Sequence, residues 1–232
     1  MRKADGEFFI IGHRGAAGER LENSLAGFGH ALKLDIDAIE LDIREHGGTL
    51  WVFHDHQLER LTGIAESFES QADIGAIKLN NSEPLPSLKQ VLDLVWGKIS
   101  LIIEMKAVVD VQLLLDLLAG YPPLEAPTGL PWIMISSFNH QKLLELRQLD
   151  CQWPLAMINL GVPIHVDHVI RDIAPYSWHF RDEDVDFDLV RQLHGKDVLS
   201  LVFTVNDAAR ADFLKQNGIG GIFTDIPSTL KG

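Results

Sequence analysis

Cysteine, basic residues and long apolar runs are all scarce in this sequence. Cys151 is the single cysteine of the 232 residues, so no intrachain disulfide can form and the fold does not depend on an oxidising compartment. No apolar run approaches the roughly 20 residues of a membrane-spanning helix, and the beginning of the chain lacks the apolar stretch of roughly 7–15 residues that a signal peptide needs. We therefore expect a cytoplasmic protein without stable membrane association.

The shortage of basic residues makes the chain strongly acidic. There are 20 Lys and Arg against 33 Asp and Glu, a formal net charge of -13. Such a surface repels nucleic-acid phosphates and anionic membranes, so we expect no nucleic-acid partner. An anionic substrate could bind only where a bound cation and a few well-placed Arg or Lys side chains reverse the local field.

What the chain does contain is a regular alternation of short apolar runs and amphipathic stretches. The hydrophobic fraction of 46% fits a globular enzyme. The alternation predicts an α/β fold of the (β/α)8 TIM-barrel class, with residues 1–232 as a single catalytic domain. An open doubly wound sheet is the alternative. The expected strands are Phe8–Ile11, Ala38–Ile43, Ile99–Glu104, Trp132–Ser136, Pro154–Met157, Tyr176–Phe180, Val198–Thr204 and Gly221–Thr224. The expected helices are Ser24–Leu34, Leu88–Val95, Val109–Leu118, His140–Leu149, Val166–Ile173, Asp186–Leu193 and Ala208–Asn217.

Residues 56–86 fit this alternation least well. We expect them to form a small insertion after the second strand, with Trp51–Phe53 as an extra short strand before it. An insertion on a βα loop of a barrel lies over the active-site face.

A pair of carboxylates lies near the end of the second expected strand. Because side chains alternate along a strand, Glu40 and Asp42 share one face, whereas Ile39, Leu41 and Ile43 share the other. If the apolar face meets the helices, both carboxylates point into the barrel mouth. Two close buried carboxylates are costly unless a cation compensates them, and carboxylate oxygens suit Mg²⁺ or Ca²⁺. A solvated pair on an edge strand is the alternative.

The third expected strand repeats this pattern. Glu104 and Lys106 share a face at the strand end, where Glu104 could complete a three-carboxylate metal site and Lys106 could bind a phosphate oxygen. Alone, such a pair is more often a salt-bridged strand end.

Two histidines follow strands in the first quarter of the chain. His13 and Arg14 lie between glycines at the end of the first strand, and His54 follows the expected short strand Trp51–Phe53. Histidine titrates near neutrality and suits proton transfer, while the arginine fork matches phosphate oxygens. Each of these features alone is a weak signal.

In order and spacing, the combination resembles the glycerophosphodiester phosphodiesterase family of the bacterial cytoplasmic type. The resemblance spans nearly the whole chain. It rests on His13-Arg14-Gly15, Glu22-Asn23-Ser24, Glu40-Leu41-Asp42, His54-Asp55, Glu104-Met105-Lys106, Thr204-Val205-Asn206 and Gly221-Ile222-Phe223-Thr224-Asp225-Ile226-Pro227.

The resemblance implies a metal-dependent TIM barrel that hydrolyses small-molecule glycerophosphodiesters to glycerol 3-phosphate and an alcohol. It implies one divalent cation, Mg²⁺ or Ca²⁺, on Glu40, Asp42 and Glu104. It further implies that His13 and His54 act as the general acid and base.

Three residues are expected to contact the substrate. Arg14 and Lys106 would bind the phosphate, and Phe203 would supply an apolar ring where the family usually has Trp. The head group could be choline, ethanolamine, glycerol or inositol. Neither it nor the oligomeric state follows from the sequence.

Two other functions fit parts of the pattern. His54-Asp55-His56 contains a His-x-His motif, which in barrel hydrolases can bind zinc, and His179 is a candidate further ligand. That combination would indicate a zinc amidohydrolase. A barrel that binds a phosphodiester without turnover is the non-enzymatic alternative.

Overall fold

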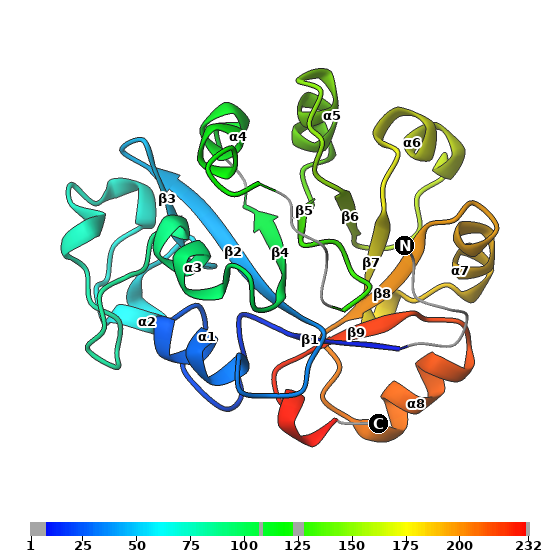
Figure 1. Cartoon of the computed structure of the whole chain (residues 1–232), viewed down its shortest axis with the longest axis horizontal. Helices are drawn as coiled ribbons and strands as arrows, with labels where there is room; N and C mark the ends of the chain where they lie inside the picture. Colours follow the sequence, from blue (N-terminus) through cyan, green and yellow to red (C-terminus); the bar gives the residue numbers. More distant parts are fainter. Residues whose placement is uncertain (1–7, 107–108, 123–127, 231–232) are drawn as a thin grey trace.

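The computed structural model describes residues 8–106, 109–122 and 128–230. Eight parallel strands form a closed barrel that is surrounded by helices (Figure 1). The predicted TIM barrel is therefore confirmed. The barrel strands are β1 (Phe9–Gly12), β2 (Ala38–His46), β4 (Ser100–Met105), β5 (Ile133–Ser137), β6 (Leu155–Asn159), β7 (Ser177–Arg181), β8 (Leu199–Phe203) and β9 (Gly221–Thr224).

Closure of the barrel depends on β1, which pairs in parallel with both β2 and β9. The first and last strands of the chain are thus neighbours, and their carboxyl ends lie side by side. An additional strand, β3 (Thr49–Val52), pairs antiparallel with β2. It corresponds to the extra strand expected at Trp51–Phe53, shifted towards the N-terminus.

Helices follow most of the strands and cover the outside of the barrel (Figure 1). They are α1 (Leu25–Ala31), α3 (Leu88–Val95), α4 (Val111–Leu118), α5 (His140–Gln148), α6 (Val166–Ile173), α7 (Phe187–His194) and α8 (Ala208–Gln216). Helix α3 shows why these segments are helical. Its apolar residues recur at the spacing of one helix face and are buried, and Ser87 begins the helix with a capping box that includes Gln90.

Strand alternation separates the core into an outer and an inner layer. Ile39, Leu41 and Ile43 point outward and pack in the cluster between barrel and helices. A smaller apolar cluster, which includes Phe9, Ile102, Leu201 and Phe223, lies inside the barrel. Because Glu104 follows Ile102 by two residues, its side chain also points inward, closer to the carboxyl end of the strands. The apolar inner layer therefore forms the floor on which polar side chains of the mouth rest.

Residues 56–86 form a separate small unit between β3 and α3. They contain one short helix, α2 (Glu59–Thr62), and two 3-10 helices, η1 (Phe68–Ser70) and η2 (Ile74–Ala76). Their apolar side chains form a separate cluster together with Phe53, which precedes the unit; the members within it are Leu58, Leu61, Phe68, Ile74, Ile77, Leu79 and Leu85. That this unit is an insertion over the active-site face stays a prediction.

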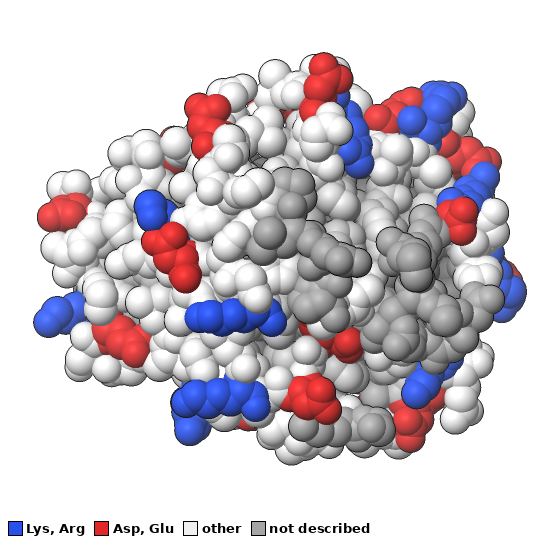
Figure 2. All heavy atoms as spheres, viewed as in Figure 1, with Lys and Arg blue, Asp and Glu red and all other residues white. Residues whose placement is uncertain are grey.

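The visible surface carries charges of both signs, and the single thiol lies inside the protein. On the face shown in Figure 2, acidic and basic side chains are interspersed around the periphery. Cys151 is buried and free. Within the described ranges, we find no helix with the length and apolar character that crossing a membrane requires.

The neutral state of His179 should make folding depend on pH. Burial lowers the pKa of His179 to about 3 from its ordinary 6.5, and its Nε2 lies 2.9 Å from the hydroxyl of Ser177. Between these two pKa values the unfolded chain takes up a proton that the folded chain does not. Stability should therefore fall as the pH drops below 6.5, by about 1.4 kcal/mol per pH unit from this group.

Urea unfolding of wild type and His179→Gln at pH 5 and pH 7 measures this contribution. We expect the wild type to lose more unfolding free energy than the variant between the two pH values. An equal loss would show that His179 does not couple folding to protonation.

Candidate active site

The residues that the sequence singled out gather at the carboxyl ends of neighbouring strands. A TIM barrel brings all these ends to one rim, which is where its active sites lie. Their positions are His13 and Arg14 after β1, Glu40 and Asp42 in β2, His54 after β3, Glu104 and Lys106 in and after β4, and Phe203 at the end of β8.

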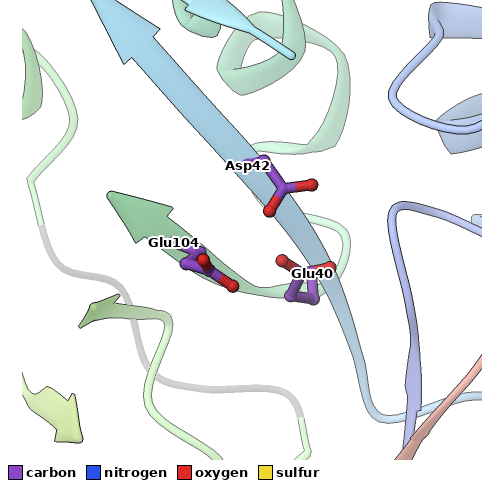
Figure 3. Close-up of side chains that lie close together, drawn as sticks. All are labelled: Glu40, Asp42 and Glu104. Carbon is purple, nitrogen blue, oxygen red and sulfur yellow. The ribbon is translucent and has the colours of Figure 1, made fainter. Parts of the chain in front are cut away.

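Three carboxylates meet between β2 and β4 (Figure 3). The strand register sets Asp42 opposite Glu104, and Glu40, Asp42 and Glu104 each place a ligand oxygen within 4.8 Å of the others. Glu40 Oε1 is buried and accepts no hydrogen bond. Burial raises the pKa of Glu40 well above its ordinary value, and the charges of Asp42 and Glu104 raise it further. Burial and the charge of Asp42 likewise raise the pKa of Glu104, to about 7.

Two cations partly compensate this negative charge. Lys106 Nζ lies 2.8 Å from Asp42 Oδ1 and also contacts Glu104. Arg14 Nε lies 3.3 Å from Asp42 Oδ2, and the Arg14 backbone N–H donates to Glu40 at 2.9 Å. Three carboxylates thus face two cationic side chains, which leaves one negative charge in excess. The raised pKa values of Glu40 and Glu104 reflect this excess, and it gives the cluster capacity for an added cation.

Asp42 is the most strongly stabilised carboxylate of the cluster. Burial alone would raise its pKa, but the positive charges of Lys106 and Arg14 hold that pKa well below its usual range. Asn23 donates a further hydrogen bond to Asp42 at 2.9 Å. Asn23 adopts the left-handed conformation, with φ 51°, which asparagine tolerates better than most residues. Asp42 is therefore ionised, and it orients the groups around it.

The loop after β1, which carries His13 and Arg14, is tightly folded. A Cβ atom on Gly12 would lie 2.0 Å from the carbonyl oxygen of Gly15, so only glycine fits at position 12. Gly15 donates its N–H to the carbonyl of Glu40 at 3.2 Å. These contacts hold the first motif of the sequence directly against the carboxylate strand.

Each of the two histidines is paired with an aspartate. His13 Nδ1 lies 2.7 Å from Asp225 Oδ1, and His54 Nδ1 lies 2.7 Å from Asp55 Oδ1. Burial would raise the pKa of Asp55, but hydrogen bonds from Arg60 and His54 hold it at about 2. An ionised carboxylate only accepts hydrogen bonds, so Nδ1 carries the proton in both pairs and Nε2 is the atom free to exchange protons.

The charge state of His54 depends on the same cluster. Burial lowers the pKa of His54, the charge of Asp42 opposes this shift, and the charges of Lys106 and Arg14 add to it. His54 is therefore electrostatically connected to the carboxylate site.

An aromatic pair borders the cluster on the side of β5 and β8. The ring of Phe138, which follows β5, lies 6.0 Å from that of Phe203 in an edge-to-face arrangement. Lys106 Nζ lies 6.0 Å from the centre of the Phe138 ring. Phe138 is 41% exposed, so the pair presents an apolar surface next to the lysine.

Sequence reasoning had not assigned a role to several residues of this arrangement. Asp225 Oδ2 accepts a hydrogen bond from Asn206 at 2.8 Å while Oδ1 faces His13. Phe138 and Arg60 were also missed. A signal existed for Asp225, because a closed barrel places the end of its last strand beside the end of its first.

The histidines proposed as zinc ligands do not form a metal site. His56 is 64% exposed and pairs with Glu69, while His179 is buried against Ser177 and Phe223. In the part of the chain that the structure describes, one group of three or more His, Cys, Asp or Glu side chains is arranged to hold a metal, namely Glu40, Asp42 and Glu104. An all-oxygen site of this kind favours Mg²⁺ or Ca²⁺ over zinc.

A closed barrel with clustered ionisable side chains at its carboxyl rim is the architecture of a TIM-barrel enzyme. Residues 13–229 match the model of the glycerophosphoryl diester phosphodiesterase family, and the chain belongs to this family. It is thus a phosphoric diester hydrolase. A glycerophosphodiester phosphodiesterase of Bacillus altitudinis is 27% identical over 238 residues, covering 94% of each chain.

Solved structures of low sequence identity share the fold. A phosphodiesterase of Oleispira antarctica, in complex with the product sn-glycerol-3-phosphate, superimposes with a TM-score of 0.87 at 22% identity and covers 96% of this chain and 94% of its own. A glycerophosphodiester phosphodiesterase of Thermotoga maritima gives a TM-score of 0.78 at 20% identity, with coverages of 97% and 98%.

The repulsion within the carboxylate cluster should make the free energy of unfolding depend on pH. The folded-state pKa of Glu104 is about 7 against an ordinary 4.5, so the folded chain holds a proton there that the unfolded chain releases. The stability of the metal-free protein should fall as the pH rises from 4.5 through 7. With a chelator present and above pH 7, the free energy of unfolding of Glu104→Gln should exceed that of the wild type by up to about 3 kcal/mol.

Urea unfolding at pH 4.5 and pH 8 with EDTA tests this expectation. The variant should gain its advantage only at the higher pH. Glu183→Gln removes a carboxylate that is 80% exposed and serves as the matched control. A Glu104→Gln variant less stable than wild type at pH 8 would show that the cluster is not strained by its own charge.

Proposed function

We propose that this protein hydrolyses glycerophosphodiesters to sn-glycerol 3-phosphate and an alcohol. The observation that carries the proposal is the buried carboxylate cluster beside two histidine–aspartate pairs. The relatives' names and the product bound in the Oleispira antarctica structure support this substrate class.

A divalent cation, Mg²⁺ or Ca²⁺, would be held by Glu40, Asp42 and Glu104. The donor set fits such an ion, because it consists of carboxylate oxygens, one of which is buried without a hydrogen-bond partner. When bound, the cation would supply electrostatic stabilisation of the negative charge on the phosphoryl oxygens.

Arg14 and Lys106 would bind the phosphate of the substrate. Both side chains already lie against the carboxylate cluster, so they present positive charge at the place where a phosphate would meet it. The fork of Arg14 can bind two phosphate oxygens, whereas Lys106 offers a point charge.

His13 and His54 would move the two protons that hydrolysis requires. One accepts a proton from the attacking oxygen, which belongs either to water or to a hydroxyl of the substrate. The other delivers a proton to the leaving alkoxide, which would otherwise depart slowly. The aspartates fix both rings through Nδ1 and leave Nε2 as the exchanging atom.

The alcohol portion of the diester would contact Phe203. Its ring and that of Phe138 form the apolar border nearest Lys106. A substituent that extends from a phosphate at Lys106 would therefore meet these two rings.

Activity should depend on a divalent cation bound by the carboxylates. With a panel of glycerophosphodiesters, we expect release of sn-glycerol 3-phosphate that EDTA abolishes and that Mg²⁺ or Ca²⁺ restores. Glu40→Gln should lose activity mainly because it binds the cation more weakly, which calorimetric metal titration measures. Glu183→Gln should behave as wild type.

Two results would contradict this assignment. Turnover that persists in EDTA would exclude the cation from the reaction, and unchanged metal affinity in Glu40→Gln would exclude Glu40 as a ligand. Binding of a glycerophosphodiester without any turnover would indicate a barrel that only binds its ligand.

The two histidines should differ in their response to the leaving group. We expect His13→Ala and His54→Ala each to lower kcat by about 10²–10⁴ on a natural diester. A nitrophenyl diester has a leaving group that needs little protonation. One of the two variants, the one that lacks the general acid, should recover much of its rate on that substrate.

Steady-state kinetics of both variants on both substrates decides the roles. Equal recovery of the two variants would show that the histidines do not divide the acid and base roles. Near-wild-type turnover of a natural diester by either variant would remove that histidine from the reaction.

A further inference from the structure

Arg60, which lies outside the barrel, links two parts of the candidate site: the pair of His54 with Asp55 and the pair of Arg14 with Glu22. It lies on α2, in the unit of residues 56–86. Its guanidinium donates to both oxygens of Asp55, at 2.6 and 3.0 Å, and to both oxygens of Glu22, at 2.6 and 2.7 Å. Each of these carboxylates in turn contacts a proposed active-site residue.

Two branches of hydrogen bonds start at Arg60, one through Asp55 and one through Glu22, and they end at residues with different proposed roles. Asp55 accepts a hydrogen bond from His54 Nδ1 at 2.7 Å. Glu22 accepts a hydrogen bond from Arg14 at 2.8 Å. A continuous series of alternating charges therefore runs from the proton-transferring imidazole through Arg60 to the phosphate-binding guanidinium.

Arg60 is itself firmly held. The neighbouring side chains Leu58 and Leu61 are buried in the apolar cluster of residues 56–86. The backbone carbonyl of Arg60 accepts a hydrogen bond from Asn80 at 2.9 Å, and Gly63 ends the helix in the left-handed conformation with φ 73°. These contacts fix the start of the side chain, so the guanidinium reaches the same place each time the segment folds.

We propose that Arg60 is a positioning residue that sets His54 and Arg14 in one mutual arrangement through Asp55 and Glu22. The proposal rests on the proposed function only for the roles of His54 and Arg14; the hydrogen bonds stand without it. It gives the unit of residues 56–86 a task in the reaction, because Arg60 is this unit's contact to both branches.

Geometry rather than charge alone makes arginine necessary here. Two edges of one planar guanidinium engage two carboxylates at once, and a lysine ammonium cannot satisfy both with four hydrogen bonds. Single exposed ion pairs contribute little, but Glu22 and Asp55 are only 12% and 21% exposed although Arg60 is 49% exposed. The carboxylates are therefore ordered, and the arginine fixes their orientation.

Double-variant kinetics separates positioning from general stability. The test uses Arg60→Gln and Arg60→Lys in the metal-loaded full chain, each alone and combined with His54→Ala or His13→Ala. His13 is the matched reference, because Asp225 and Asn206 orient it without Arg60. Arg171→Gln, which removes an exposed pair with Asp172 on α6, is the charge control.

We expect Arg60→Gln to lower kcat about 10–100-fold, since small misplacements of reacting groups have effects of this size. The loss should shrink in the His54→Ala background to the part that acts through Glu22 and Arg14, because the ring that Arg60 positions is gone. It should persist in full in the His13→Ala background. Arg60→Lys should recover only part of the loss, and Arg171→Gln should match wild type.

Two readouts do not depend on turnover. Affinity for sn-glycerol 3-phosphate, measured by calorimetry, should fall several-fold in Arg60→Gln through the Arg14 branch. The His54 Nδ1 proton, observed by NMR, should exchange with water faster in Arg60→Gln than in wild type or Arg171→Gln. If the wild type shows no turnover, the proposed function fails, and these two measurements still decide the positioning role.

Urea unfolding midpoints establish whether each variant is folded. If Arg60→Gln does not fold, Arg60→Lys takes its place in all of these measurements. Three results would overturn the proposal. These are wild-type kcat/KM in Arg60→Gln, an equal loss in the His13→Ala and His54→Ala backgrounds, or product affinity and Nδ1 exchange both unchanged.

Discussion

The mutual repulsion of three buried carboxylates is the constraint on which the rest of the site depends. Parallel pairing of β2 with β4 forces Asp42 opposite Glu104, and the two-residue period of β2 adds Glu40 on the same side. Such a group cannot be buried without compensation. Arg14, Lys106 and the amide of Asn23 meet part of this requirement. The same groups that stabilise the cluster thereby place positive charge around it, where the phosphate is proposed to bind.

Closure of the barrel is the second constraint, because it unites groups from opposite ends of the chain. β1 has both β2 and β9 as neighbours. The loop after β1 consequently reaches the Glu40 backbone on one side and Asp225 on the other. His13 obtains its orienting carboxylate from a residue 212 positions away, so a change in the last strand acts directly on the first motif.

The sequence allowed prediction of those features that local periodicity determines. The period of two in β2 correctly assigned Ile39 to the outer core and Glu40 to the interior, and the period of α3 gave its buried face. It could not reveal partners fixed by tertiary contact, such as Asp225 for His13 or Arg60 for Asp55. Residues 56–86 lacked a period because they form short 3-10 turns around their own apolar cluster. The burial of His179 inside the barrel also depends on the closed fold rather than on its neighbours in sequence.

Overall charge and local charge have different consequences in this protein. The net charge of -13 includes carboxylates with a structural task, since Glu22, Asp55 and Asp225 pair with Arg14, His54 and His13. Together with the three cluster carboxylates they number six, against three cations, Arg14, Arg60 and Lys106. With every carboxylate ionised, the arrangement would carry an excess of three negative charges and would repel a phosphodiester, and the raised pKa values of Glu40 and Glu104 are the response of the metal-free protein to this excess. The cation proposed for Glu40, Asp42 and Glu104 would offset two of these charges. Such a cation would serve the binding of an anionic substrate as much as its cleavage, because the carboxylates would otherwise dominate the local field.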